Sequence, residues 1–175
     1  MKVNVDASRL AHIFRELAGL VPDPGFLVLE TPCNEVREME LRKTDDDPNH
    51  RDVYYLDGLE QSRFQTLFTN YSDLLIHDGF VQFGYGSHDT SRTNEVFVGD
   101  FKVLWIFAID PEPYEEKIRG WRIPRVEKLL TARDTFTQEH PGYKNRWSRG
   151  NFDIYEMLET LIRSEGLYHA KTIED

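Results

Sequence analysis

The clearest fold pattern in the sequence lies in residues 80–109, where short apolar runs alternate with polar or glycine-containing stretches. The runs at 80–85, 95–98 and 101–109 have the composition and length of β-strands. The polar stretch 87–94 predicts the loop of a hairpin between the first two. Both alternating sets of the last run are apolar, which predicts a central strand buried on both faces. We therefore predict an antiparallel β-meander here.

Amphipathic helices are predicted on both sides of this meander. Apolar residues recur at the spacing of one helical face over residues 8–18 and 58–77, which predicts an N-terminal and a central helix. The C-terminal third is predicted to be helical and to pack on the sheet, with three helices that begin at Pro111, Pro124 and Asp153. The order lacks regular strand–helix alternation, so we predict one α+β domain spanning residues 1–175.

Three other segments bear on the sheet. Residues 26–30 and 53–56 are short apolar runs that predict further strands, and an exposed edge on either one would allow a homodimer through sheet extension. Residues 35–43 are ambiguous, because the alternation of Met39 and Leu41 with charged residues favours an edge strand. A helix capped by Asn34 is the alternative for that segment, and we favour the strand.

The charge of the chain is unevenly distributed. The formal net charge is −10, from 21 basic and 31 acidic residues. Residues 117–149 contain nine basic and three acidic residues, a net charge of +6, so the remainder carries −16. Such asymmetry suggests a charged partner or ligand. A remainder this acidic repels a phosphate backbone, so nucleic acid is disfavoured as a partner.

Aromatic residues are interleaved with the arginines of the basic segment 117–149, a composition that suits the binding of anions and stacked rings. The candidate binding residues there are Arg119, Trp121, Arg122, Arg125, His140, Tyr143, Arg146 and Trp147. Three interpretations stay open. The arginines pair with acids of the same domain, or the tryptophans are core anchors with basic neighbours in solvent, or the segment binds a partner or an anionic ligand.

A second candidate is the glycine-containing segment 84–89, which includes His88 and Asp89. A glycine-rich strand end can bring backbone N–H groups to an anion, but the third glycine of a dinucleotide fingerprint is absent. The alternative, purely structural interpretation is that the glycines let the strand twist into a hairpin loop. We expect no bound cofactor on these grounds.

Metal and nucleophile motifs are weak. The pairs His77–Asp78 and His88–Asp89 flank a predicted strand whose ends lie roughly 25–30 Å apart, so they cannot share one ion. We therefore expect no metal site. Cys33 is the single cysteine, and a lone cysteine without a local signature is more often buried than catalytic.

Two functions are consistent with these features. The first is a small acidic cytoplasmic protein that acts by non-catalytic protein–protein interaction, as an inhibitor, immunity-type or accessory protein, because complementary charge steers association. The alternative is an enzyme for a small anionic substrate, with arginines and histidines of segments 117–149 and 84–89 in the site. No apolar run is long enough for a membrane span, so we expect no membrane association.

Overall fold

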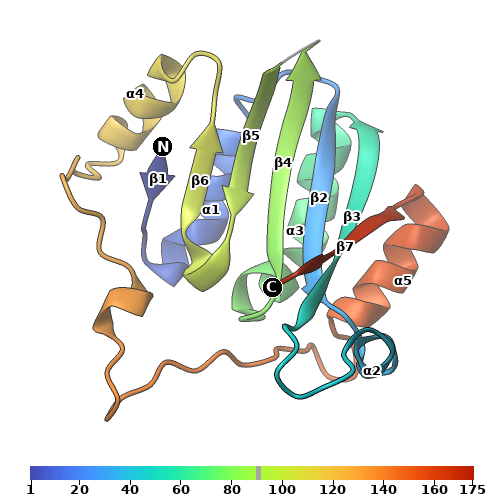
Figure 1. Ribbon diagram of the computed structural model, residues 1–175. Helices are drawn as coiled ribbons and strands as arrows, with labels where there is room; N and C mark the ends of the chain where they lie inside the picture. Colours follow the sequence, from blue (N-terminus) through green and yellow to red (C-terminus); the bar gives the residue numbers. More distant parts are fainter. Residues whose placement is uncertain (90–91) are drawn as a thin grey trace.

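The computed structural model describes residues 1–89 and 92–175 and confirms the α+β class (Figure 1). In this part of the chain, seven strands form one antiparallel sheet in the order β1-β6-β5-β4-β2-β3-β7. The strands are β1 (Lys2–Val3), β2 (Gly25–Pro32), β3 (His50–Leu59), β4 (Gln82–Asp89), β5 (Arg92–Val98), β6 (Leu104–Phe107) and β7 (Tyr168–Glu174). The α-helices are α1 (Ala7–Ala18), α2 (Glu35–Leu41), α3 (Gln61–His77), α4 (Glu112–Gly120) and α5 (Ile154–Glu165).

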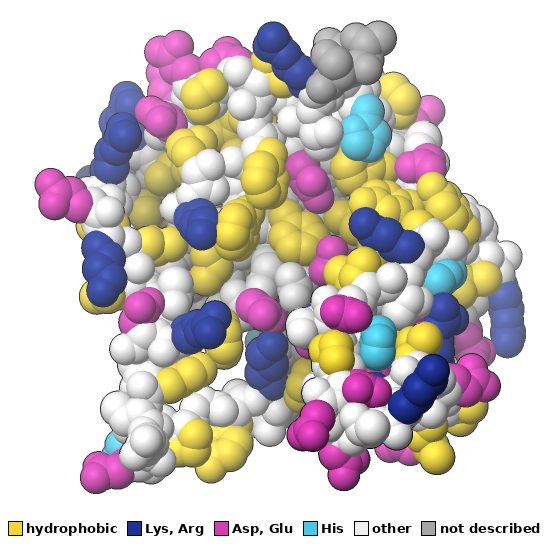
Figure 2. Space-filling view, viewed as in Figure 1, with side chains coloured by type: hydrophobic (Ala, Val, Ile, Leu, Met, Phe, Trp, Pro, Cys, Tyr) yellow, Lys and Arg dark blue, Asp and Glu magenta, His cyan; other side chains and the backbone are white. Residues whose placement is uncertain are grey.

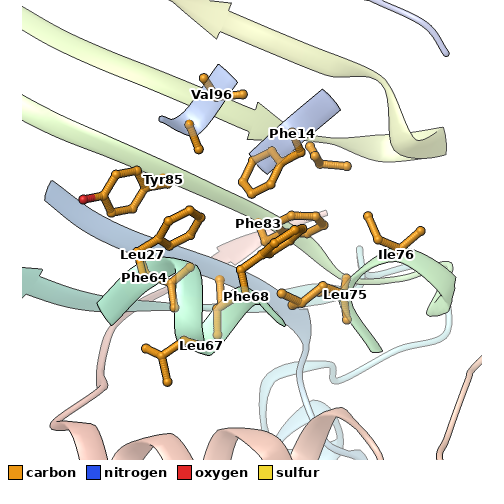
Figure 3. Packing of buried hydrophobic residues seen from close by; sticks show 14 of the residues in the cluster. Phe14, Leu27, Phe64, Leu67, Phe68, Leu75, Ile76, Phe83, Tyr85 and Val96 are labelled. Carbon is orange, nitrogen blue, oxygen red and sulfur yellow. The ribbon is translucent and has the colours of Figure 1, made fainter. Parts of the chain in front are cut away.

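Helices α1 and α3 cover one face of the sheet, and the main hydrophobic core lies between them and the strands. The centre of this core is a group of aromatic rings (Figure 3). Phe14 of α1 contacts Phe64 and Phe68 of α3 and Phe83 of β4, with ring centroids 4.8–6.1 Å apart. Phe64 also stacks on Tyr85, whose hydroxyl donates to the Leu59 carbonyl over 2.9 Å. The amphipathic spacing of both helices is therefore used to bury one stripe on the sheet.

The opposite face of the sheet has no helix over its central strands in the described ranges, and Figure 1 views the molecule from this side. A second, smaller cluster of buried apolar residues lies there, formed by Phe26, Val28 and Val53. Tyr55 and Phe97 pack against it and are partly exposed. Because successive strand residues point to opposite faces, the same strands supply both clusters.

Most predicted helices are confirmed. The segments 8–18 and 58–77 correspond to α1 and α3, and the helices predicted to begin at Pro111 and Asp153 correspond to α4 and α5. Asp153 accepts hydrogen bonds from the amides of Tyr155 and Glu156, as the predicted helix start requires.

The helix predicted to begin at Pro124 is wrong. The chain is irregular through this region, apart from a short 3₁₀ turn at Ala132–Thr135. A helix here was expected to turn Val126, Leu129, Leu130 and Phe136 inward, but Leu129 is only partly buried and the other three are exposed. The spacing of these residues resembles a helical face, but the described part of the chain does not bury such a face.

The strand favoured for residues 35–43 is also wrong, because Glu35–Leu41 form α2. The alternative was correct, since the Asn34 side chain accepts a 2.9 Å hydrogen bond from the Arg37 amide at the helix start. None of the α2 residues is buried. Because no face of α2 packs on the core, its sequence has no regular spacing of apolar residues that would indicate a helix.

Three sheet predictions need correction. The strands predicted at 26–30 and 53–56 lie inside the sheet, so neither offers the free edge that was expected for a homodimer. The run at 101–109 forms only the short strand β6, with Leu104 and Ile106 buried on the helix side and Trp105 partly exposed on the other. The predicted loop 87–94 is largely paired, because β4 extends to Asp89 and β5 begins at Arg92.

Candidate functional site

The face of the sheet opposite α1 and α3, which we call the open sheet face, carries buried apolar residues together with partly exposed aromatic and acidic side chains. It consists of Phe26, Val28, Glu30, Val53, Tyr55, Gly84, Gly86, Glu95, Phe97, Trp105 and Phe107. Figure 2 shows this side, with acidic side chains among hydrophobic ones near the middle of the sheet. The register of the strands decides which of these residues are neighbours.

Two rows of side chains cross the open sheet face. The first row follows the pairing Trp105, Phe97, Gly84, Val28 and Tyr55 from β6 to β3. The second row follows the pairing Phe107, Glu95, Gly86 and Phe26 from β6 to β2. Side chains that lie directly opposite each other on neighbouring strands are close enough to be in contact, so the residues of each row pack against one another. Glu95 thus lies between aromatic residues.

The two glycines of β4 allow these rows to close over the central strand. A Cβ atom at Gly84 would lie 2.8 Å from a ring carbon of Phe97. At Gly86 it would lie 2.6 Å from the ring of Phe26 and 2.9 Å from the Asn94 carbonyl oxygen. Both glycines are therefore required by the close approach of side chains from neighbouring strands, and the surface over β4 is made by those neighbours.

Glu30 and Glu95 place two partly buried carboxyl groups on this face. Burial raises the pKa of Glu95 to about 7, and the nearby charge of Glu30 adds to the shift. Burial also raises the pKa of Glu30, while Arg51 and Lys171 oppose that shift. Among the described residues, neither carboxyl group takes part in a recorded hydrogen bond or ion pair. Such groups are stabilised by a cation brought from outside.

At one end of the open sheet face, Arg51 is held by acceptors of the same chain, although its buried Nη2 atom has no hydrogen-bond partner among the described residues. Arg51 is buried, and its Nε atom donates to Asp175 over 2.6 Å. Its Nη1 atom donates to the Phe80 carbonyl over 2.6 Å, and its Nη2 atom lies 3.8 Å from Asp100. We therefore assign Arg51 a structural role at the end of the sheet.

His88 is the one predicted site residue that the structure places on this side of the sheet beside Phe26. Its ring stacks on the Phe26 ring with centroids 4.6 Å apart, and its Nδ1 atom lies 3.1 Å from the Thr93 hydroxyl. The side chain of Asp89 lies outside the described residues. His88 therefore extends the aromatic surface.

The basic segment 117–149 largely pairs with the rest of the chain. Four ion pairs join it to acids elsewhere: Lys117 with Glu16, Lys144 with Asp100, Arg146 with Asp78, and Arg149 with Asp73. The interpretation that these basic residues neutralise acids of the same chain holds for these four. Lys117 lies in α4, and the other three hold residues 144–149 against the body of the protein.

The aromatic and remaining basic residues of the segment are dispersed. Trp121 packs on His12 with centroids 5.9 Å apart, and Trp147 packs on His77 at 5.5 Å, so both tryptophans act as partly buried anchors. Arg122, His140 and Tyr143 are exposed. Arg119 and Arg125 line a groove beside β1 and α4. The predicted residues thus do not converge with His88 on one cleft.

Cys33 does not have the surroundings of a nucleophile. Its side chain is buried, and burial together with the nearby Asp52 raises the pKa of the thiol to about 12. The thiolate is the reactive form, so the environment suppresses its reactivity. The Oδ1 atom of Asp52 accepts a 2.7 Å hydrogen bond from the Thr172 hydroxyl and lies 2.9 Å from Nε2 of His169. Within residues 1–89 and 92–175, no group of three His, Cys, Asp or Glu side chains is arranged to hold a metal ion.

Sequence reasoning missed Glu30 and Glu95 as site residues. Each is the one acidic residue in an otherwise apolar strand run, FLVLE or EVFV. A charged residue in register with buried apolar residues is a usable indication of a site. What the sequence did not supply is the pairing of β2, β4 and β5, which brings these two carboxyl groups to one face.

Comparison with known proteins gives no relative: no family model, no curated protein and no solved structure matches the chain. Among the helices that the structure describes, none is both long enough and apolar enough to cross a membrane.

Proposed function

We propose that this protein acts by non-catalytic protein–protein interaction, as an inhibitor, immunity-type or accessory protein. In this proposal its open sheet face binds a basic surface of another protein. The observation that carries it is the pair Glu30 and Glu95, two partly buried carboxyl groups that make no hydrogen bond or ion pair with the described residues and lie among aromatic side chains.

The carboxyl groups favour a partner that supplies a lysine or arginine. Their burial already removes much of their hydration, so an approaching cation gains Coulomb energy in a medium of lowered dielectric. Charge-assisted hydrogen bonds to a guanidinium or ammonium group would also satisfy oxygen atoms that have no recorded donor in the described chain. The site is therefore complementary to a cationic side chain.

The surrounding residues supply the apolar part of such an interface. Phe107 lies in the same row as Glu95, and Phe97 and Trp105 lie in the neighbouring row. All three are partly or largely exposed. Aromatic side chains dominate the energetics of many protein interfaces because they bury a large area with few rotatable bonds. A net charge of −10 adds long-range attraction for a basic partner.

The alternative function, an enzyme for a small anionic substrate, has a narrower basis. It requires arginines and histidines of segments 117–149 and 84–89 in one cleft. The groove beside α4 contains Arg119 and Arg125 but neither His88 nor His140. The residues of the groove therefore favour the binding of an anion, but they include no histidine that could transfer a proton to that anion.

Site-specific photo-crosslinking in the producing cell tests the proposed interaction. A photoreactive amino acid is placed at Phe107, on the open sheet face, and in a second variant at Tyr143, which is 82% exposed and lies in the basic segment 117–149. We expect one basic protein to be captured from Phe107 and not from Tyr143. Capture from both positions, or from neither, would contradict the proposal.

The captured protein is then purified and its affinity is measured. We expect the double variant Glu30→Gln and Glu95→Gln to bind at least tenfold more weakly, and binding to weaken as salt is raised. The matched control is Glu159→Gln, which removes an exposed carboxyl group of α5 whose ion-pair partner among the described residues is Arg163. Equal affinities of the wild type and the double variant would overturn the assignment of the surface.

A homodimer through sheet extension is a further proposal, now with different strands. In the described sheet the outer strands are β1 and β7. Because β1 has only two residues, β7 offers the longer edge for such pairing.

A further inference from the structure

We propose that the groove between β1, α4 and residues 123–130 is a second binding site, which takes a small apolar molecule with a carboxylate head. The groove has a volume of about 480 Å³. This lies within the range of roughly 300–1,000 Å³ that is usual for small-molecule sites. The inference is independent of the protein–protein interaction proposed above.

The chain after α4 is attached to the N-terminal part of the protein at both ends of the groove. At one end, Trp121 packs on His12 of α1 and its carbonyl accepts a hydrogen bond from Arg9. At the other end, the Asn4 side chain donates to the Leu130 carbonyl over 2.7 Å. Between these points Arg122 adopts a positive φ of 58°, which turns the chain outward. The intervening residues form the outer wall of the groove.

The inner surface of the groove is mainly apolar. Its apolar lining includes Val3, Ile118, Ile123, Val126, Leu129 and Leu130. Val126 is 54% exposed and Leu130 is 64% exposed, although both line the concave side. Apolar side chains that line a concavity and stay exposed gain free energy when an apolar ligand covers them.

Positive charge at the groove favours an anionic head group. Arg119 and Arg125 line it, and neither has a recorded ion pair or side-chain hydrogen bond in residues 1–89 and 92–175. Lys2 also lines the groove, although its ammonium group lies 3.8 Å from the centre of the Trp105 ring on the open sheet face. Glu115 is the single acidic residue of the lining. Two arginines that form no ion pair with the described residues, beside an apolar groove, are complementary to a carboxylate with a hydrocarbon tail.

Titration calorimetry with decanoate, below its micelle-forming concentration, tests this proposal. We expect decanoate to bind with a stoichiometry of one and decanol to bind at least tenfold more weakly, since the alcohol lacks the charge. We expect methyl resonances of Val3, Ile118 and Val126 to shift on addition of decanoate, and those of Val28 and Val53 on the open sheet face to stay in place. Shifts confined to the open sheet face would overturn the assignment.

Variants separate the charge of the groove from the charge of the whole segment. The double variant Arg119→Gln and Arg125→Gln is expected to bind decanoate at least tenfold more weakly, with decanol binding unchanged. The matched control is Arg133→Gln, an exposed arginine of the same segment outside the groove lining. No decanoate binding by the wild type, or an equal loss with Arg133→Gln, would overturn the proposal. Neither result would bear on Glu30 and Glu95.

Discussion

At the scale of single residues, the fold strongly alters the acid–base chemistry of Glu95. Its side chain extends over Gly84, where a Cβ atom would come within 3.0 Å of its Oε1 atom. Aromatic neighbours in its row exclude water, and burial raises the pKa of its carboxyl group to about 7. The charge of this side chain therefore changes near neutral pH.

The first prediction concerns the stability of Glu95→Gln as a function of pH. Because the pKa of Glu95 rises from 4.5 to about 7 on folding, the unfolded chain loses this proton first as the pH rises. The free energy of unfolding of the wild type should thus fall between pH 4.5 and pH 7 relative to the variant. We expect the difference to grow by about 3 kcal/mol across that window. Urea unfolding from pH 4 to 8 measures it, and a difference that does not change with pH would contradict the prediction.

The second prediction concerns the thiol of Cys33. With its pKa raised to about 12, only a minute fraction is thiolate at pH 8. We expect alkylation by iodoacetamide to be about a thousandfold slower in the native protein than in the urea-unfolded chain. Mass spectrometry of timed samples provides the measurement. Complete labelling of the native protein within minutes would instead show that the thiol is accessible and ionised.

The sequence could not reveal the environment of Cys33, because the pairing of β2 and β3 is what brings Asp52 close to this thiol.

At the scale of elements, β4 is the strand on which the open sheet face depends. Its inward residues Phe83 and Tyr85 fill the main core, while its outward positions Gly84 and Gly86 lie beneath side chains of β2 and β5. The large residues of β4 thus pack against the helices, and its glycines leave space for neighbouring side chains on the other face. The alternating sequence Phe-Gly-Tyr-Gly produces both arrangements, because successive strand residues point to opposite faces.

The third prediction follows from the space above these glycines. Gly86→Ala should lower the free energy of unfolding by about 1–3 kcal/mol, because the new Cβ atom meets both the Phe26 ring and the Asn94 carbonyl. Gly84→Ala should also destabilise, since Phe97 must move. Gly120→Ala in α4 is the control, with no atom within 4 Å of the added carbon, and should be neutral or slightly stabilising. Equal stabilities of all three variants would show that the rows do not close over β4.

Elements that pack one face on the core were predictable, and elements without such a face were not. Helices α1, α3 and α5 carry a regular apolar period because each buries a stripe. Helix α2 has no buried residue and β7 is almost wholly exposed, so neither imposes a pattern on its sequence. The helix predicted after Pro124 is wrong for the opposite reason. Val126, Leu129 and Leu130 have a helix-like apolar spacing, but they line a groove and do not pack as a helical face on the core.

At the scale of the whole molecule, the uneven charge is explained in part by internal pairing. The basic segment passes along the sheet end, where Lys144 and Arg146 reach Asp100 and Asp78 (Figure 1). The same contact explains Gly79, whose added Cβ atom would lie 3.1 Å from the Asn145 amide nitrogen. The charge split was readable from the sequence. The division of its arginines between ion pairs and the groove was not, because that division depends on the irregular path of the chain.

The fourth prediction tests whether Asp78 holds the segment in place. Asp78 is fully buried and accepts hydrogen bonds from the amides of Phe80 and Trp147, at 2.9 and 3.3 Å. Its replacement by alanine leaves these amides without their acceptor and removes the carboxylate that lies 3.7 Å from Arg146. We expect Asp78→Ala to lower the free energy of unfolding by about 3 kcal/mol. Amide exchange should accelerate at Trp147 and Gly79.

The matched control is Asp73→Ala, which removes the partner of Arg149 at a more exposed position. Surface ion pairs of this kind contribute about 0–1 kcal/mol, so this variant should keep nearly the full stability and the slow exchange at Gly79. If both variants released the segment equally, opposite charge in general would hold it to the sheet. If only Asp78→Ala released it, one buried carboxylate would do so, and the paired arginines at the surface would mainly offset the acidity of the body.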